Sequence, residues 1–287
     1  MKYYKVDFSI SSPNGLMQES RDILSALAGE AGFETFEETD FGLTGYVQQS
    51  LFDRPLLDQL LLDFPLPDCQ MTYTVAEAED CDWNAAWEQE GFAPIQVADL
   101  CVIHDGRHLP DRVFPLSIEI DAHLAFGTGT HETTRMMVAS ILEHDLSGCR
   151  VLDCGTGTGI LAIAALKHGA SQSVGYDIDE WSVDNARHNA VLNHVDDRFT
   201  SLLGDSALLH EDIPGTFQLV MANINRNILL HDLPLFCQKL TEGGCLLLSG
   251  FYAADVSLLE SAARDNGLFL ERERHDGEWV CLAFAKR

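Results

Sequence analysis

The sequence predicts an α/β protein in which a doubly wound sheet of seven strands follows a small α+β domain. Three observations carry this prediction. Residues 151–161 read as a buried strand, a glycine turn and an immediate helix start. Strand-like and helix-like apolar patterns then alternate through residues 150–266, as in sheets built from strand–helix–strand units. The first 78 residues instead follow the order βαββαβ, which is the ferredoxin-like pattern.

The domain expected at residues 1–78 resembles a binding module more than a catalytic one. Apolar alternation predicts strands, and apolar residues three or four apart predict helices. The expected strands are 4–10, 33–37, 42–49 and 70–75, and the expected helices are 16–31 and 53–63. The domain contains 13 acidic and 4 basic residues, a net charge of −9, and no histidine.

Residues 79–90 are predicted to link this domain to a second one that spans 91–287. Trp83 and Trp87 are four residues apart and would share a face of a helix, which favours a hydrophobic latch between the domains. Strands expected within 91–121 extend the second domain. His104 and His108 fall among them without an acid at useful spacing and are predicted to be loop or surface histidines.

The turn at residues 153–159 has the form Asp-x-Gly-x-Gly-x-Gly. Its glycines allow a ligand to approach the backbone closely, and the helix behind them offers unpaired N–H groups. Asp177 ends the next predicted strand, where an acid can accept hydrogen bonds from ribose hydroxyls. The glycine spacing is not that of a dinucleotide site, and Ile160-Leu161 replace the Lys-Ser/Thr pair of a phosphate loop. The remaining alternative is a tight turn without a ligand.

A second glycine-containing loop, residues 125–134, precedes this turn and leads into a predicted helix. It is expected to fold over a ligand in the same cleft, although a simple capped helix start is the alternative. Thr130 or Thr133 could supply the cap. His131 is predicted to order the loop by hydrogen bonding, because no second histidine lies near it to complete a metal site.

Later strands bring two more polar residues toward the same cleft. Asn223 ends the predicted strand 217–223, at the edge where a doubly wound sheet binds its ligands. Asp205 follows another strand and is placed to accept a hydrogen bond from an adenine amino group; a solvated loop acid is the alternative. A fifth strand at 243–251 and a hairpin around Asp276-Gly277 complete the sheet.

Composition excludes several classes of function. No apolar run approaches the roughly 18 residues that a membrane span needs, and the start of the chain is not a signal peptide, so a cytoplasmic enzyme is expected. The eight cysteines form no Cys-x-x-Cys pair, which predicts neither a metal site nor redox chemistry. A net charge of −27 disfavours direct binding of nucleic acid. It suits a basic protein partner, or solubility alone.

The glycine turn resembles the first motif of class I S-adenosylmethionine-dependent methyltransferases, which have a Rossmann-like sheet. The loop Phe126–Thr134, the turn Asp153–Gly159, Asp177 and Ala222-Asn223-Ile224 occur here together and in order. In that combination the chain is similar, over nearly its whole length, to the ribosomal protein L11 methyltransferase (PrmA) family.

The resemblance implies S-adenosylmethionine as the cofactor and a large-subunit ribosomal protein as the substrate. The first domain would recognise that protein, and the second would methylate its lysine ε-amines, its N-terminal α-amine, or both. Asn223 would be the catalytic residue because it orients the amine. The expected cofactor-binding residues are Phe126, Thr128, Thr134, Gly155, Gly157, Gly159, Asp177, Asp205 and Asn223.

Two segments depart from the usual pattern of the family. Ile224-Asn225 and Asp121-Ala122-His123 stand where Ile-Leu-Ala and Asp-Pro-Gly are common, which bears on the positioning of the target more than on the cofactor. Two alternatives stay open: a small-molecule N-methyltransferase whose first domain mediates dimerisation, and a noncatalytic interaction protein that retains the fold. The sequence predicts no oligomeric state.

Overall fold

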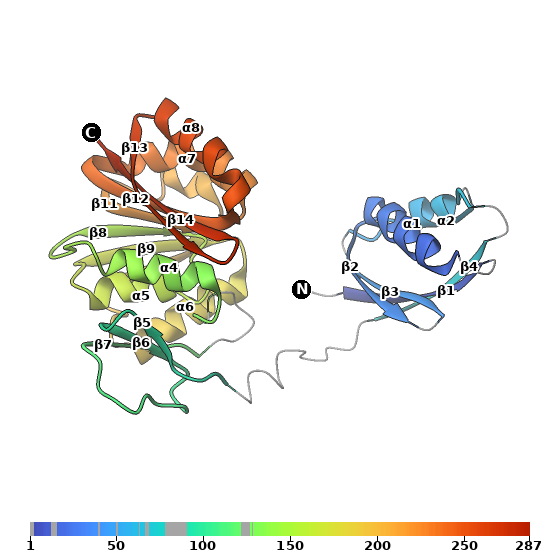
Figure 1. The fold of residues 1–287 in the computed structure, drawn as a ribbon, viewed down its shortest axis with the longest axis horizontal. Helices are drawn as coiled ribbons and strands as arrows, with labels where there is room; N and C mark the ends of the chain where they lie inside the picture. The colour runs from blue at the N-terminus through green and yellow to red at the C-terminus, as the bar shows by residue number, and fades with distance from the viewer. Residues whose placement is uncertain are drawn as a thin grey trace. The chain divides into compact units, whose positions relative to one another are not determined.

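The computed structural model describes residues 3–12, 16–39, 41–49, 51–62, 64–66, 69–77, 91–121, 127 and 129–287. The chain divides into two compact units, Met1–Trp83 and Asn84–Arg287 (Figure 1). The predicted linker at 79–90, with its two tryptophans, lies outside the described residues.

The first unit has the predicted βαββαβ order. Its elements are β1(Tyr3–Ser11), α1(Met17–Glu30), β2(Phe33–Thr39), β3(Gly42–Gln48), α2(Arg54–Leu62) and β4(Gln70–Glu77). The four strands form an antiparallel sheet in the order β2-β3-β1-β4, and both helices cover one face of it (Figure 1). Val6, Phe8 and Ile10 alternate along β1 and are buried, together with Leu24 and Leu57 from the helices. Period-two alternation therefore places one face of the sheet in a small core.

The second unit contains the predicted sheet of seven strands, in the order β10-β9-β8-β11-β12-β14-β13. Neighbours from β10 to β12 are parallel, whereas β14 pairs antiparallel with β12 and with β13. The C-terminal hairpin is confirmed, and its second strand inserts between β12 and the first. The strands are β8(Arg150–Cys154), β9(Gln172–Asp177), β10(Phe199–Leu203), β11(Phe217–Asn223), β12(Leu240–Tyr252), β13(Leu268–Asp276) and β14(Trp279–Lys286).

Helices cover both faces of this sheet (Figure 1). One apolar core includes residues of α4, α5 and α6, and a second includes residues of α7 and α8. The ranges are α4(Glu132–Ile141), α5(Ile160–Lys167), α6(Glu180–Leu192), η1(Ser206–Leu209), α7(Arg226–Lys239), η2(Ala253–Asp255) and α8(Val256–Asp265). The alternation of strand and helix puts the carboxyl ends of the parallel strands at one edge, where ligands bind in such folds.

Residues 91–121 form a separate sheet of three short strands, β5(Ile95–Val97), β6(Cys101–His104) and β7(Leu116–Glu119). His104 is only 7% exposed, and its Nε2 lies 2.9 Å from Ser117 Oγ. The prediction of a loop or surface histidine is therefore wrong for His104, because neighbouring polar groups satisfy its ring within the sheet. His108 is exposed as predicted, but its Nδ1 lies 2.7 Å from Asp105 Oδ2, so an acid does lie at useful spacing from it.

Within the described ranges, no helix is both long and apolar enough to cross a membrane. Across the same residues, no three histidines, cysteines or acids gather in a way that could hold a metal ion. The described cysteines are free, and Cys101, Cys154, Cys237 and Cys281 are buried.

Candidate active site

The glycine turn between β8 and α5 is shaped by its backbone conformation and, at two of its three glycines, by close neighbours. Gly155, Gly157 and Gly159 all have positive φ values, of 72°, 52° and 81°, which glycine adopts without strain. A Cβ on Gly155 would lie 2.4 Å from Ile224 Cγ2, and one on Gly159 would lie 3.1 Å from the Cβ of Ala186 on α6. Gly155 thus allows β8 and β11 to meet at the sheet edge, and Gly159 allows two helices to pack.

Asp153 holds the turn from beneath. Its carboxyl group is fully buried, and Oδ2 accepts hydrogen bonds from Thr156 Oγ1 at 2.8 Å and from the Ala162 N–H at 3.3 Å. Burial raises the pKa of Asp153 to about 7, with the nearby charge of Asp177 as a further cause. This side chain connects the turn to the first helical residues behind it.

Asp177 closes the turn from the neighbouring strand, β9. Its Oδ2 accepts a hydrogen bond from the Gly157 N–H at 2.9 Å, and Oδ1 accepts one from the Asp179 N–H at 3.1 Å. Each carboxylate oxygen can accept a second hydrogen bond. Asp177 therefore both fixes the glycine turn and retains two acceptor positions for a ligand.

A cavity of about 370 Å³ lies at the carboxyl edge of the sheet, within the size range of small-molecule sites. It brings together five of the predicted residues: Gly155, Gly157, Asp177, Asp205 and Asn223. Asp232 on α7 also lines it. Among the described lining residues, every charged side chain is an aspartate. The cavity therefore favours a cationic ligand over a phosphate.

Asn223 ends β11 beside the glycine turn. Its Oδ1 is buried and has no hydrogen-bond partner within the described part of the chain. A buried acceptor without a partner is unfavourable unless a ligand supplies a donor. Asn225, one of the departures from the family pattern, caps α7 by accepting a hydrogen bond from the Asn227 N–H at 2.8 Å.

The structure does not bring every predicted residue to the cavity. Thr134 is fully buried on α4, and its Oγ1 has no partner within the described ranges. Neither Thr134 nor Gly159 is among the described residues that line the cavity. Asp205 is exposed, and its Oδ1 caps η1 by accepting from the Ala207 N–H at 2.9 Å. Phe126 and Thr128 lie outside the described residues, as do Ala122 and His123.

The loop before α4 contacts the glycine turn through Thr158, whose Oγ1 donates to the Gly127 carbonyl at 2.7 Å. His131 caps α4: its Nδ1 accepts from the Thr133 N–H at 3.3 Å and lies 2.8 Å from Thr133 Oγ1. A cap from Thr130 or Thr133 was therefore the wrong prediction, because His131 provides the cap. An imidazole nitrogen at this position serves as the acceptor that a threonine oxygen usually provides.

Two asparagines on α6 and a third at its C-cap were not predicted from the sequence. Asn185, Asn189 and Asn193 are spaced four residues apart and hydrogen-bond to the backbone of Glu119 and Asp121. Asn189 Nδ2 also donates to the Thr158 carbonyl at 2.9 Å. The ladder thus joins the end of β7 to the glycine turn. Its signal in the sequence was the i, i+4, i+8 spacing of one residue type.

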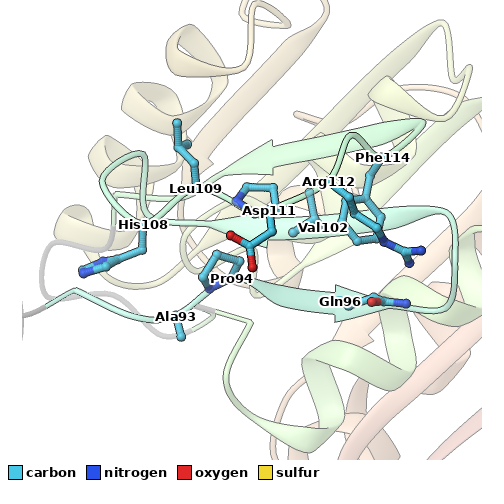
Figure 2. Close-up of a pocket in the computed structure, with 10 residues that line it drawn as sticks. Ala93, Pro94, Gln96, Val102, His108, Leu109, Asp111, Arg112 and Phe114 are labelled. Carbon is cyan, nitrogen blue, oxygen red and sulfur yellow. The ribbon is translucent and has the colours of Figure 1, made fainter.

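A second cavity, of about 560 Å³, lies beside β5 and β6. Figure 2 shows Val102 and Pro94 along it and Arg112 next to Phe114. The Arg112 guanidinium lies 4.4 Å from the Phe114 ring centre and also pairs with Asp99 at 3.2 Å. None of the predicted cofactor-binding or catalytic residues is among the described residues that line this cavity.

The strand order, the glycine turn, the acid that ends β9 and the asparagine that ends β11 define a class I S-adenosylmethionine-dependent methyltransferase. Comparison with known proteins specifies the class further. Residues 10–287 match the family model described as ribosomal protein L11 methyltransferase (PrmA). The chain therefore belongs to the ribosomal protein L11 methyltransferase (PrmA) family.

Individual relatives agree with this membership. A ribosomal protein L11 methyltransferase of Phocaeicola vulgatus is 42% identical over 284 residues, covering 99% of each chain. One of Porphyromonas gingivalis is 42% identical over 286 residues, covering 99% of this chain and 98% of its own. The crystal structure of a ribosomal protein L11 methylase from Lactobacillus delbrueckii subsp. bulgaricus superposes with a TM-score of 0.62 at 31% identity, covering 68% of this chain and all of that one.

Proposed function

We propose that this protein transfers methyl groups from S-adenosylmethionine to amino groups of ribosomal protein L11, on lysine ε-amines, the N-terminal α-amine, or both. The observation that carries the proposal is the meeting of Gly155, Asp177 and Asn223 at one cavity, in a chain that matches its relatives over nearly its full length. A ribosomal substrate makes the cytoplasm the expected location.

The residues at this cavity fit S-adenosylmethionine. Asp177 retains acceptor positions for ribose hydroxyls beside its hydrogen bonds from Gly157 and Asp179, and Gly155 and Gly157 line the cavity with backbone that carries no Cβ. The lining charges are all negative among the described residues, which suits a sulfonium and does not suit the phosphates of NAD or ATP.

Two carboxylates are assigned to the cofactor by this proposal. Asp177 accepts hydrogen bonds from the ribose hydroxyls with its two remaining acceptor positions, and Asp205 accepts from the adenine amino group with Oδ2. Backbone at Gly155 and Gly157 faces the amino-acid end. Thr134, Phe126, Thr128 and Gly159 complete the predicted set, with Thr134 and Gly159 acting through the neighbouring loop and helix.

When bound, S-adenosylmethionine supplies a methyl group on a positively charged sulfur. Asn223 Oδ1 accepts a hydrogen bond from the incoming amine and turns its lone pair toward that methyl group. A neutral amine is required, and a free lysine has a pKa of about 10.4. Removing water around the amine favours its neutral form, so alignment and desolvation are the main contributions of the protein.

The first unit is proposed to capture the substrate. Its acidic excess over residues 1–78 complements a basic protein, and such complementarity raises the association rate. The cofactor residues all lie in the second unit. Binding of the ribosomal protein and chemistry on it would therefore be divided between the two units.

The function is tested by methyl transfer from radiolabelled S-adenosylmethionine, offered purified ribosomal protein L11 and a set of small amines. Label in the protein, located on amines by mass spectrometry, is expected. Label in small amines alone would support the small-molecule alternative. Parallel calorimetric titrations with S-adenosylmethionine, NAD and ATP should give binding only for the first.

A further inference from the structure

Helix α7 places a carboxylate on the side that faces the sheet. Leu229, Leu233 and Phe236 are fully buried on this side, and Asp232 lies among them with an exposed fraction of 4%. Asp232 also lines the cavity at the sheet edge. A buried carboxylate is unfavourable unless hydrogen-bond donors surround it, so its partners decide what it does.

Of the two oxygens of the Asp232 carboxylate, Oδ1 has hydrogen-bond partners among the described residues. Ser206 Oγ donates to Oδ1 at 2.8 Å, and His231 Nδ1 lies 2.7 Å from the same oxygen. Within the described residues, Oδ2 has no hydrogen-bond partner. Neighbours from η1 and α7 thus orient the group and leave one oxygen for a ligand.

The hydrogen bond to Ser206 locates Asp232 beside Asp205. These two acids come from different elements, and both line the cavity together with Ser206. Asp205 uses Oδ1 to cap η1, so each acid has one oxygen without a partner among the described residues. The cavity therefore presents two acceptors in the same region.

We propose that Asp232 Oδ2 accepts the second N–H of the adenine 6-amino group, while Asp205 accepts the first. This inference rests on the proposed function. A 6-amino group offers two donors, whereas the 6-oxo group of hypoxanthine is an acceptor. Two carboxylates facing a 6-oxo group would leave acceptors opposed and unpaired. Asp232 is thus a specificity-determining residue that selects an adenine cofactor.

The test is calorimetric binding of S-adenosylhomocysteine and S-inosylhomocysteine to the full-length protein and its variants. The unmodified protein is expected to prefer the adenine compound by about tenfold or more, the value of one charged hydrogen bond. In Asp232→Asn the new amide N–H can donate to a 6-oxo group, so this preference should fall by about tenfold. Asp255→Asn is the matched control, since Asp255 pairs with Arg226 at 2.7 Å and should leave the preference unchanged.

The ratio of the two affinities distinguishes direct contact between Asp232 and the 6-amino group from a purely structural role of Asp232. If Asp232→Asn weakens both compounds equally, or if the preference falls only in Asp205→Asn, the inference is wrong. Should Asp232→Asn fail to fold, Ser206→Ala keeps the carboxylate but removes a donor that orients it, and must lower the preference in the same direction. If the unmodified protein binds neither compound, both the proposed function and this inference are wrong. If the unmodified protein binds tightly and Asp232→Asn has the same ratio of affinities, only the inference is wrong.

Discussion

Replacing Asp177 with alanine removes an acceptor that serves the proposed cofactor and the fold at once. The carboxylate holds the Gly157 and Asp179 N–H groups at 2.9 and 3.1 Å. Its two remaining acceptor positions are those assigned to the ribose hydroxyls. The substitution therefore has two measurable consequences, one for binding and one for stability.

Their sizes follow from the number of hydrogen bonds lost. A hydrogen bond to a charged group contributes roughly 1.5–3 kcal/mol, so loss of the ribose contacts should weaken S-adenosylmethionine binding tenfold or more, since about 1.4 kcal/mol corresponds to a factor of ten. The two backbone N–H groups lose their acceptor as well. At about 1.5 kcal/mol or more each, this lowers Tm by several degrees in a domain of this size.

Calorimetric titration with S-adenosylmethionine and a thermal melt measure the two effects on the same sample. Asp184→Ala is the matched control, because Asp184 forms an exposed ion pair with Arg187 at 3.0 Å, and such pairs contribute little. A folded Asp177→Ala variant with unchanged affinity would refute the ribose assignment. An affinity loss shared by Asp184→Ala would show that the effect is not local.

Three further substitutions test other parts of the site. Asn223→Ala should keep the fold and reduce turnover strongly, as steady-state kinetics would show; full activity would remove Asn223 from the site. Gly155→Ala should lower Tm and cofactor affinity, because its Cβ would lie 2.4 Å from Ile224 Cγ2, whereas Gly267→Ala, also at positive φ but with open space around it, should cost only stability. Asp153 has its pKa raised from 3.8 to about 7, so between these values the native state binds more protons and the free energy of unfolding falls as pH rises. Asp153→Asn should remove this dependence on pH. Denaturant titrations of both proteins at pH 5 and pH 8 give the difference in their free energies of unfolding, and this difference should shift in favour of the variant at pH 8. A difference that is the same at both pH values would contradict the assignment.

Much of the site could be predicted because its signals are local. The glycine turn needs positive φ values within a few residues, and Asp177 follows directly from the end of a strand. Asn223 likewise occupies a position that strand topology alone defines. Such residues are recognisable in a sequence because each ends a predicted strand, and the carboxyl ends of parallel strands meet at one edge of the sheet.

Other features depend on contacts between distant segments and left weaker signals. The insertion of β14 between β12 and β13 is set by pairing that no turn residue encodes. Asp232 reads in the sequence as one more acid in an acidic chain, and only its partner Ser206, 26 residues away, marks it as a cavity residue. His131 shows the same limit, since a helix cap was expected from threonine and is provided by an imidazole.

The salt dependence of association tests the proposed role of the first unit in binding the substrate. Residues 1–78 carry a net charge of −9, so association of the full-length enzyme with the ribosomal protein should slow as salt rises. An association rate that does not change with salt concentration would contradict electrostatic capture. Stopped-flow association at increasing salt concentration measures this rate.

The most direct test of the two-part account compares the full-length protein with a truncated protein that begins at Asp80. S-adenosylmethionine affinity and methyl transfer to purified ribosomal protein L11 are measured on both. The account predicts equal cofactor affinity, methylation by the full-length protein, and loss of methylation by the truncated one. Methylation by the truncated protein at the full-length rate, or none by either protein despite tight cofactor binding, would contradict it.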